Sequence, residues 1–245
     1  MKLVDYAETE IIPFLRDMLE KTHAKGYVLG LSGGIDSALV SLLAVKAVGK
    51  DKVFHLILPC ASKTTKDVDD AVEFAKKFDL TYKIVDLTST FDSFIQENKE
   101  LTGMSVANVK VRLRMVTLYA YSQQLNYLVL GTDNWDENYT GYFTKHGDGA
   151  CDLLPIVELT KSEVFALARH YGCTETILNR APSASLWEGQ TDENEMGITY
   201  DELDSYLLHG KENLSEKAIQ RIEHLHQVSE HKRNLAPRPN KYIRD

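Results

Sequence analysis

The sequence predicts an α/β fold with a mostly parallel, doubly wound sheet flanked by helices. Short apolar runs typical of buried strands alternate with longer segments in which apolar residues recur about every 3.6 positions, as in amphipathic helices. Strands that alternate with helices imply crossover connections and therefore parallel pairing. Four runs are expected as strands, at residues 27–29, 53–58, 82–85 and 127–130.

The predicted helices lie before, between and after these strands. An amphipathic segment from about Leu3 to His23 precedes the first strand, and we expect it to bend near Pro13. Further helices are expected from residue 38 onward and at residues 65–78, 90–97 and 105–124, followed by a helical C-terminal part at 160–171, 200–208 and 215–233. Residues 132–155 and 180–197 are polar and aperiodic, so we expect them to lack regular structure and to be mobile until a ligand binds and they close over it.

Composition limits the classes of protein to consider. The chain has 245 residues, 43% of them hydrophobic and 26% charged, which fits one domain spanning residues 1–245. The net charge of −8 disfavours general binding to nucleic acid or to an anionic membrane. The three cysteines are widely spaced, and neither an apolar signal core nor a membrane-spanning run occurs. We therefore expect a soluble cytoplasmic protein without a zinc site.

A glycine-rich segment joins the first strand to the next helix. It consists of Gly30, Leu31, Ser32, Gly33, Gly34, Ile35, Asp36 and Ser37. Adjacent glycines allow a sharp turn, and the free amides and positive dipole end of a helix start suit a phosphate group. No lysine follows the glycines as a Walker A loop requires, and the pattern is not G-x-G-x-x-G. Asp36 would repel phosphate unless a cation lay between them, which indicates Mg²⁺.

Two strand ends are expected to form the walls of one site. One strand ends after Leu29 and another after Leu130, and a glycine follows each of them. In open parallel sheets, ligands bind at the carboxyl ends of the strands where the strand order reverses. We therefore expect the loop at residues 30–37 and the segment after Leu130 to meet.

The loop resembles the pyrophosphate loop of the N-type ATP pyrophosphatases, and a longer stretch resembles NAD synthetases in particular. That stretch comprises Gly131-Thr132-Asp133, Glu137, Gly141-Tyr142-Phe143-Thr144-Lys145, Gly147-Asp148-Gly149, Asp152, Pro155 and Leu159-Thr160-Lys161. Residues 108–115, 182–184, 189–193 and 229–233 also match the family pattern. The resemblance implies an adenine nucleotide alpha hydrolase-like fold. It also implies a reaction in which ATP adenylylates the carboxylate of deamido-NAD and ammonia then displaces AMP to give NAD.

The same resemblance implies roles for individual residues. Besides residues 30–37, the positions that match ATP contacts are Thr132, Lys161 and Ser183, and those that match Mg²⁺ ligands are Asp36 and Glu137. The positions that match deamido-NAD contacts are Arg112, Lys145, Asp152, His231 and Lys232. Activation by adenylylation needs no protein nucleophile, so none is predicted, and Cys151 stands where the family pattern does not demand a cysteine.

The resemblance also implies assembly and a nitrogen source. The family is dimeric and its deamido-NAD site lies across the subunit interface, which makes His231 and Lys232 candidates for the partner's side of a shared site. We expect ammonia as the nitrogen donor, because the matched region starts within about the first thirty residues and leaves no room for the amidase domain of glutamine-using relatives. Two alternatives remain at this point. One is another N-type ATP pyrophosphatase that acts on a different carbonyl substrate, and the other is a non-catalytic adenine-nucleotide-binding module.

Overall fold

A four-stranded parallel sheet forms the centre of the molecule. The computed structural model describes residues 2–61, 65–180 and 191–239. The strands are β1 (Tyr27–Gly30), β2 (Val53–Ile57), β3 (Tyr82–Ile84) and β4 (Leu128–Leu130), in the spatial order β3-β2-β1-β4. All three pairings are parallel, with Tyr27 opposite both Val53 and Leu128. The chain therefore moves outward from β1 to β3 and returns to the other side of β1 with β4, which confirms the predicted reversal of strand order.

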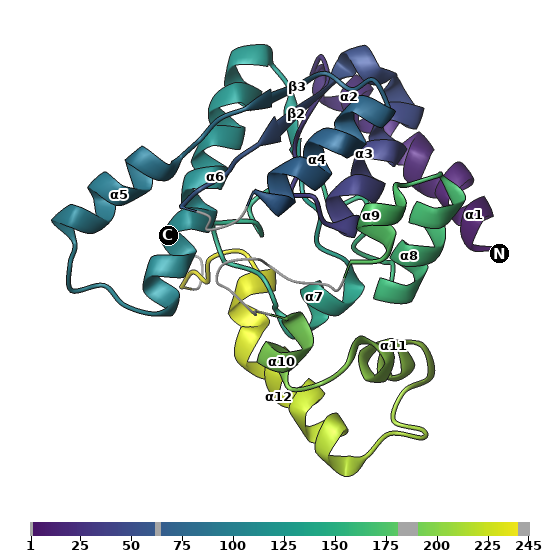
Figure 1. The fold of residues 1–245 in the computed structure, drawn as a ribbon. Coiled ribbons are helices and arrows are strands. Elements are labelled where there is room, and N and C mark those ends of the chain that lie inside the picture. Colours follow the sequence, from purple (N-terminus) through teal and green to yellow (C-terminus); the bar gives the residue numbers. More distant parts are fainter. Residues whose placement is uncertain (1, 62–64, 181–190, 240–245) are drawn as a thin grey trace, which may run out of the picture.

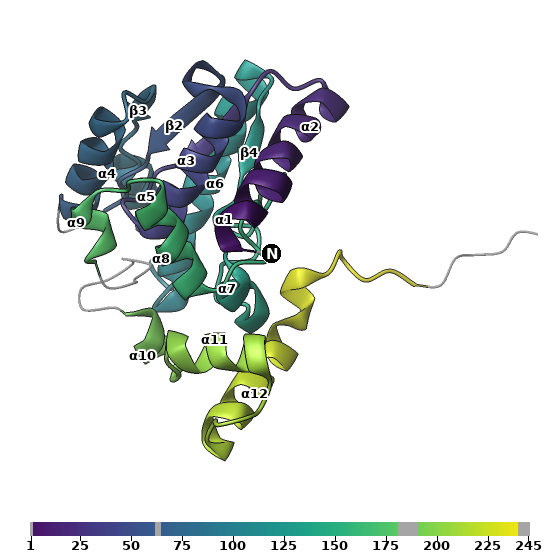
Figure 2. The ribbon, with the colours of Figure 1, turned by 90° about the vertical axis from the view of Figure 1, so that its right-hand side faces the viewer.

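Helices cover both faces of this sheet (Figures 1 and 2). On one face, Tyr27 and Leu29 pack in a large core with α2 (Ile12–Thr22), α3 (Ile35–Val48), α4 (Lys66–Lys77) and α8 (Lys161–His170). On the other face, Val28 and Leu56 pack against α5 (Thr88–Glu97) and α6 (Met104–Leu125). Side chains of successive strand residues point to opposite faces, so both faces of β1 are buried and its sequence is continuously apolar. The doubly wound α/β prediction is confirmed.

The N-terminal helical segment is irregular just before Pro13. Helix α1 (Leu3–Tyr6) continues into a π-helical turn, η1 (Ala7–Ile11), and then into α2. Proline has no amide hydrogen to donate to the preceding turn, and a wider π turn is one way for a helix to accommodate this. The predicted disturbance near Pro13 is therefore present, as a change of helical pitch at residues 7–11.

The remaining short elements connect the larger ones. They are η2 (Lys50–Lys52), α7 (Trp135–Thr140), α9 (Glu175–Leu178) and α10 (Asp192–Met196). The C-terminal part continues with α11 (Tyr200–His209) and α12 (Glu216–Arg233). In both views α10, α11 and α12 gather at one end of the molecule, below the sheet, with α7 between them and the sheet (Figures 1 and 2). A separate small core of Met196, Ile198, Tyr200, Leu203 and Ile222 holds this end together.

Both segments that the sequence marks as aperiodic contain a short helix. Residues 132–155 were expected to lack regular structure, and this is wrong, because α7 lies within them. A capping box opens α7: the Asn134 side chain accepts a hydrogen bond from the Glu137 amide (3.0 Å), and the Glu137 carboxylate accepts one from the Asn134 amide (3.3 Å). In the second segment, α10 occupies residues 192–196, and residues 181–190 lie outside the described part of the chain.

No helix within the described residues is long and apolar enough to span a lipid bilayer.

Candidate active site

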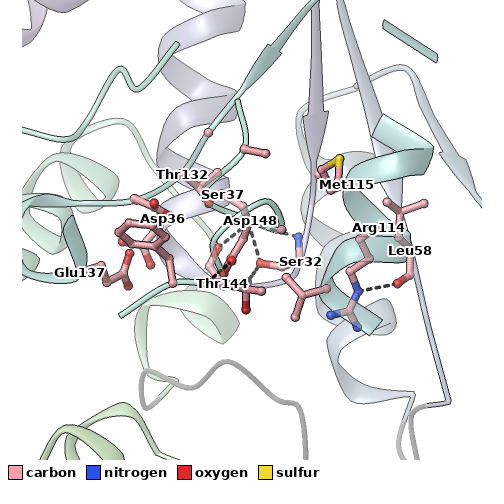
Figure 3. Close-up of a pocket in the computed structure, with 18 of the residues that line it drawn as sticks. Ser32, Asp36, Ser37, Leu58, Arg114, Met115, Thr132, Glu137, Thr144 and Asp148 are labelled. Atoms are coloured by element: carbon pink, nitrogen blue, oxygen red, sulfur yellow. Dashed lines mark hydrogen bonds between the residues drawn. The ribbon is translucent and has the colours of Figure 1, made fainter. Parts of the chain in front are cut away.

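A cavity of about 590 Å³ opens where β1, β2 and β4 end (Figure 3). Its lining includes the glycine-rich loop, the buried side of α6, the α7 segment, the first residue of α8 and the last turn of α12. Residues far apart in the chain therefore meet at the strand ends, as the reversal of strand order predicts. The members that the sequence singled out are Gly30, Leu31, Ser32, Gly34, Ile35, Asp36, Ser37, Arg112, Thr132, Glu137, Lys145, Lys161, His231 and Lys232.

The glycine-rich loop is fixed by its own serines. The Ser37 hydroxyl accepts a hydrogen bond from the Ser32 amide (3.2 Å) and donates one to the Gly34 carbonyl (2.9 Å). The two serine Oγ atoms lie 3.0 Å apart, and the Ser32 hydroxyl accepts a bond from the Gly34 amide (3.2 Å). Because α3 begins at Ile35, its first amides have no partner within the helix and are available to an anion.

Gly33 is required by the backbone geometry of the loop. Its φ of +81° lies in the left-handed region, and a methyl group there would lie 2.5 Å from the Asp67 carbonyl oxygen. The loop therefore packs directly against the start of α4. Gly34 and Asp36, which follow Gly33 in the loop, line the cavity.

Asp36 and Glu137 converge on one cation, the side chain of Lys161. The Lys161 ammonium lies 2.7 Å from Asp36 Oδ2 and 3.3 Å from Glu137 Oε1. Asn134 steadies the pair by donating from Nδ2 to Asp36 Oδ1 (2.9 Å). Burial would lower the pKa of Lys161, but the two carboxylates together hold it above its usual value. Burial raises the pKa of Glu137.

This arrangement fits the predicted divalent-metal site. Two carboxylates from different elements, the first turn of α3 and the first turn of α7, already share one positive charge beside the phosphate loop. Hard oxygen ligands of this kind are what Mg²⁺ takes in proteins, together with substrate phosphates and water. Within the described residues, no group of three or more His, Cys, Asp or Glu side chains is placed to hold a metal ion. Substrate phosphates and water could supply further ligands.

A second pair of carboxylates, Asp133 and Asp148, also lines the cavity. Asp133 is 5% exposed, and burial raises its pKa, with the neighbouring Asp148 carboxylate acting in the same direction. Asp148 is exposed to solvent, yet the surrounding protein desolvates its carboxylate and raises its pKa, although backbone hydrogen bonds such as that from the Thr144 amide (2.7 Å) oppose the shift. Arg114 lies on the α6 side of the cavity and donates from Nε to the Leu58 carbonyl (3.0 Å) (Figure 3).

Four of the five predicted deamido-NAD residues form one cationic wall. The Lys145 ammonium donates to the His231 carbonyl (2.5 Å), and the Arg112 guanidinium donates to the Lys145 carbonyl (3.2 Å). The Lys232 ammonium donates to the carbonyls of Gly141 and Phe143, at 2.7 Å each. One chain therefore brings His231 and Lys232 to Lys145 without a partner subunit.

The fifth residue, Asp152, lies outside the cavity lining. It is exposed, and it accepts hydrogen bonds from the Val129 amide (2.7 Å) and the Tyr119 hydroxyl (3.3 Å). It therefore ties the segment after α7 to β4 and α6. Ser183, a predicted ATP contact, lies outside the described residues.

Comparison with known proteins identifies the family of this chain. The family model described as NAD synthase matches residues 8–236. The chain belongs to the NAD synthase family. This chain is 45% identical over 248 residues to the NH(3)-dependent NAD(+) synthetase of Mesoplasma florum, and the alignment covers 100% of both chains. It is 41% identical to the enzyme of the same name from Thermococcus sibiricus, over 96% of this chain and 98% of that one.

Solved structures of family members share the fold. A structure described as NMN synthetase from Francisella tularensis superposes with a TM-score of 0.92 at 42% identity, covering 98% of this chain and all of that one. The NH3-dependent NAD synthetase from Campylobacter jejuni, in complex with the nitrate ion, gives a TM-score of 0.83 at 31% identity with the same coverage. The adenine nucleotide alpha hydrolase-like fold is thereby confirmed.

Within this family framework, sequence reasoning missed three supporting groups. Asn134 orients Asp36, and its signal was the N-x-x-E spacing to Glu137, a capping box that also predicts α7. Asp192 accepts hydrogen bonds from Tyr142 (3.1 Å) and Tyr200 (3.0 Å). The centre of the Tyr200 ring lies 5.0 Å from the Lys161 ammonium. Tyr200 belongs to the small C-terminal core, so this core contacts the lysine that pairs with Asp36 and Glu137. Nothing in the local sequence of these tyrosines pointed to Lys161.

Proposed function

We propose that this chain is an ammonia-dependent NAD synthetase, which uses ATP to amidate deamido-NAD. The observation that carries the proposal is the convergence of Asp36 and Glu137 on one positive charge beside the glycine-rich loop, in a chain of the NAD synthase family. The acceptor carboxylate attacks the α-phosphorus of ATP and pyrophosphate leaves. Ammonia then attacks the acyl-adenylate, AMP leaves with the carboxylate oxygen that was activated, and NAD is formed.

The chain's own contribution is positioning and charge neutralisation. The free amides at the start of α3 would receive the phosphates of ATP, and the fixed loop would hold them without reorganisation. Asp36 and Glu137 would hold Mg²⁺, which would neutralise phosphate charge as pyrophosphate departs. Thr132 and Lys161 face the same cavity and would contact ATP. Nothing in this scheme requires a protein nucleophile, and burial raises the pKa of the Cys151 thiol, which disfavours the reactive thiolate.

The cationic wall suits the acceptor. Lys145, His231, Lys232 and Arg112 lie on one side of the cavity, and deamido-NAD carries both phosphates and the carboxylate to be activated. The ammonium groups of Lys145 and Lys232 donate to main-chain carbonyls, and both residues line the cavity, so a bound anion could replace these carbonyls as the acceptor. Binding and orientation of two substrates in one cavity supplies much of the rate in such a reaction.

We also propose a cytoplasmic homodimer in which a second copy completes the deamido-NAD site. Exposed apolar side chains occur along α6, with Met104 52% and Val116 57% exposed, although this helix also packs on the sheet. The exposed Arg112 and Asp152 lie on or beside the same helix. Covering α6 with a second copy would bury the apolar side chains and bring Asp152 to a shared site.

A second candidate function is amidation of nicotinate mononucleotide. The observation that favours it is the TM-score of 0.92 and the 42% identity to the structure described as an NMN synthetase. The chemistry would be unchanged, because nicotinate mononucleotide carries the same ring carboxylate as deamido-NAD. Only the adenylate half of the acceptor would be missing.

One assay separates these possibilities. The purified protein is incubated with MgATP and ammonium, and with either deamido-NAD or nicotinate mononucleotide at equal concentration. AMP, pyrophosphate and the amide product are measured by chromatography. We expect one AMP per NAD with deamido-NAD and a lower kcat/KM with the mononucleotide. The reverse preference would select the second candidate, and AMP release with neither acceptor would refute both.

A further inference from the structure

Lys161 occupies an unusual place for a lysine. It is the first residue of α8, where the helix dipole disfavours a positive charge, and it is only 3% exposed. Its ammonium lies between Asp36 and Glu137, at 2.7 and 3.3 Å. The negative charges that make this position tolerable therefore belong to the protein itself.

The surroundings of this ammonium are built to hold a cation. The Tyr200 ring lies 5.0 Å from it, and Asp192, held by two tyrosines, raises its pKa along with the two closer carboxylates. Burying a charge is costly unless it is paired, and breaking such a pair leaves an uncompensated charge. Without Lys161, the Asp36–Glu137 pair would therefore attract another cation.

We propose that the Lys161 ammonium is a resident counter-ion that occupies the carboxylate pair until ATP arrives, so that the divalent ion binds with ATP and not alone. The inference rests on the proposed metal role of Asp36 and Glu137. A divalent ion bound to the same two oxygens would lie close to the Lys161 ammonium, and the repulsion between the two cations at such a distance is large in a buried site. Lysine has a flexible four-carbon stem, so its ammonium can leave the carboxylates for a phosphate oxygen when MgATP enters.

The proposal predicts a gain of metal binding when the lysine charge is removed. We would titrate the protein with Mn²⁺ in the absence of nucleotide and follow free Mn²⁺ by electron paramagnetic resonance. Lys161→Gln keeps a group that can donate to the buried carboxylates, and it should bind Mn²⁺ at least about tenfold more tightly than the unaltered protein. Lys145→Gln is the matched control, since it removes one charge from the same cavity but not from between the carboxylates. Its Mn²⁺ affinity should change by less than about threefold.

A double variant shows where the gained ion binds. Asp36→Asn in the Lys161→Gln background should abolish the gained affinity. Equal Mn²⁺ affinity of Lys161→Gln and Lys145→Gln would overturn the proposal, as would a double variant that binds like Lys161→Gln. Because no substrate is present in the Mn²⁺ titration, either result would overturn the counter-ion role of Lys161 without deciding whether the protein amidates deamido-NAD.

A measurement on the unaltered protein avoids dependence on the variants' folding. Lys161 is the one lysine that is fully buried among the described residues, so its ¹⁵N-labelled ammonium should exchange slowly with water. Millimolar Mg²⁺ alone should leave this signal unchanged, and Mg²⁺ with α,β-methylene-ATP should shift it. A shift with Mg²⁺ alone of the same size would show that the ion displaces the lysine without nucleotide, which contradicts the proposal.

Discussion

The adjacent glycines of the phosphate loop should respond very differently to the same substitution. Gly33 has a φ of +81°, and a methyl group on it would lie 2.5 Å from the Asp67 carbonyl oxygen, a backbone atom. Gly34 has a φ of −91°, and a methyl group on it would meet only the Ser32 hydroxyl oxygen, at 3.2 Å. The two sites therefore differ in backbone strain and in the rigidity of the neighbour.

The expected cost of Gly33→Ala follows from these distances. A left-handed conformation costs an L-residue roughly 1–2 kcal/mol, and moving the start of α4 away from the new methyl group adds to this. We therefore expect a loss of about 2–4 kcal/mol in the free energy of unfolding. Gly34→Ala should cost less than about 1 kcal/mol, because a compatible Gly→Ala change also lowers the entropy of the unfolded chain.

The assay is equilibrium unfolding in urea. The free energies of unfolding of the two variants are compared when the slopes of these free energies against urea concentration are equal. A smaller slope would indicate a change in the two-state behaviour and would remove that variant from the comparison. If the free energies of unfolding of Gly33→Ala and Gly34→Ala differ by less than about 0.5 kcal/mol, the packing of Gly33 against Asp67 does not contribute the stability that we infer from the geometry.

Three further perturbations test other parts of the molecule. His55 is fully buried, bonded to Ser41 Oγ (2.8 Å) and the Thr81 carbonyl (3.0 Å), and burial lowers its pKa to about 4. Because the unfolded imidazole takes up a proton near pH 6.5, stability should fall by about 3 kcal/mol between pH 6.5 and 4; urea unfolding of His55→Gln should lack this part of the pH dependence. Asp36→Asn should abolish AMP release while leaving the circular dichroism spectrum unchanged, and near-normal turnover would remove Asp36 from the metal site. Gly131→Ala places a methyl group 2.6 Å from Cys151 Sγ. Thermal unfolding should show that the free energy of unfolding falls by about 1–3 kcal/mol, because the site is overpacked.

Much of this architecture could be predicted because short-range patterns determine it. The run at β1 is apolar up to Gly30, and the run at β2 departs from an apolar pattern only at the buried His55, since both faces of these strands are covered. The reversal of strand order between β1 and β4 places the loop at residues 30–37 beside the segment after Leu130, as the strand pattern predicted. The pairing of Asp36 with Glu137 was predicted by the resemblance to NAD synthetases, and both side chains contact the Lys161 ammonium.

Contacts between distant segments could not be predicted in the same way. Lys161 was expected to hold a phosphate, and no local pattern shows that its ammonium binds Asp36, 125 residues away in the chain. Helix α7 was missed because six residues are too few for a 3.6-residue periodicity, although its capping box was visible. The deamido-NAD role of Asp152 stays a prediction: its side chain accepts a hydrogen bond from the Val129 amide and lies outside the cavity lining of one chain.

In the proposed reaction the acceptor carboxylate attacks the α-phosphorus of ATP, and AMP later departs with one oxygen of that carboxylate. Deamido-NAD labelled with ¹⁸O in the carboxylate tests this directly, in a reaction with MgATP and ammonium followed by mass spectrometry. We predict one ¹⁸O in the phosphate of each AMP and none in pyrophosphate. Unlabelled AMP, or label in pyrophosphate, would contradict it.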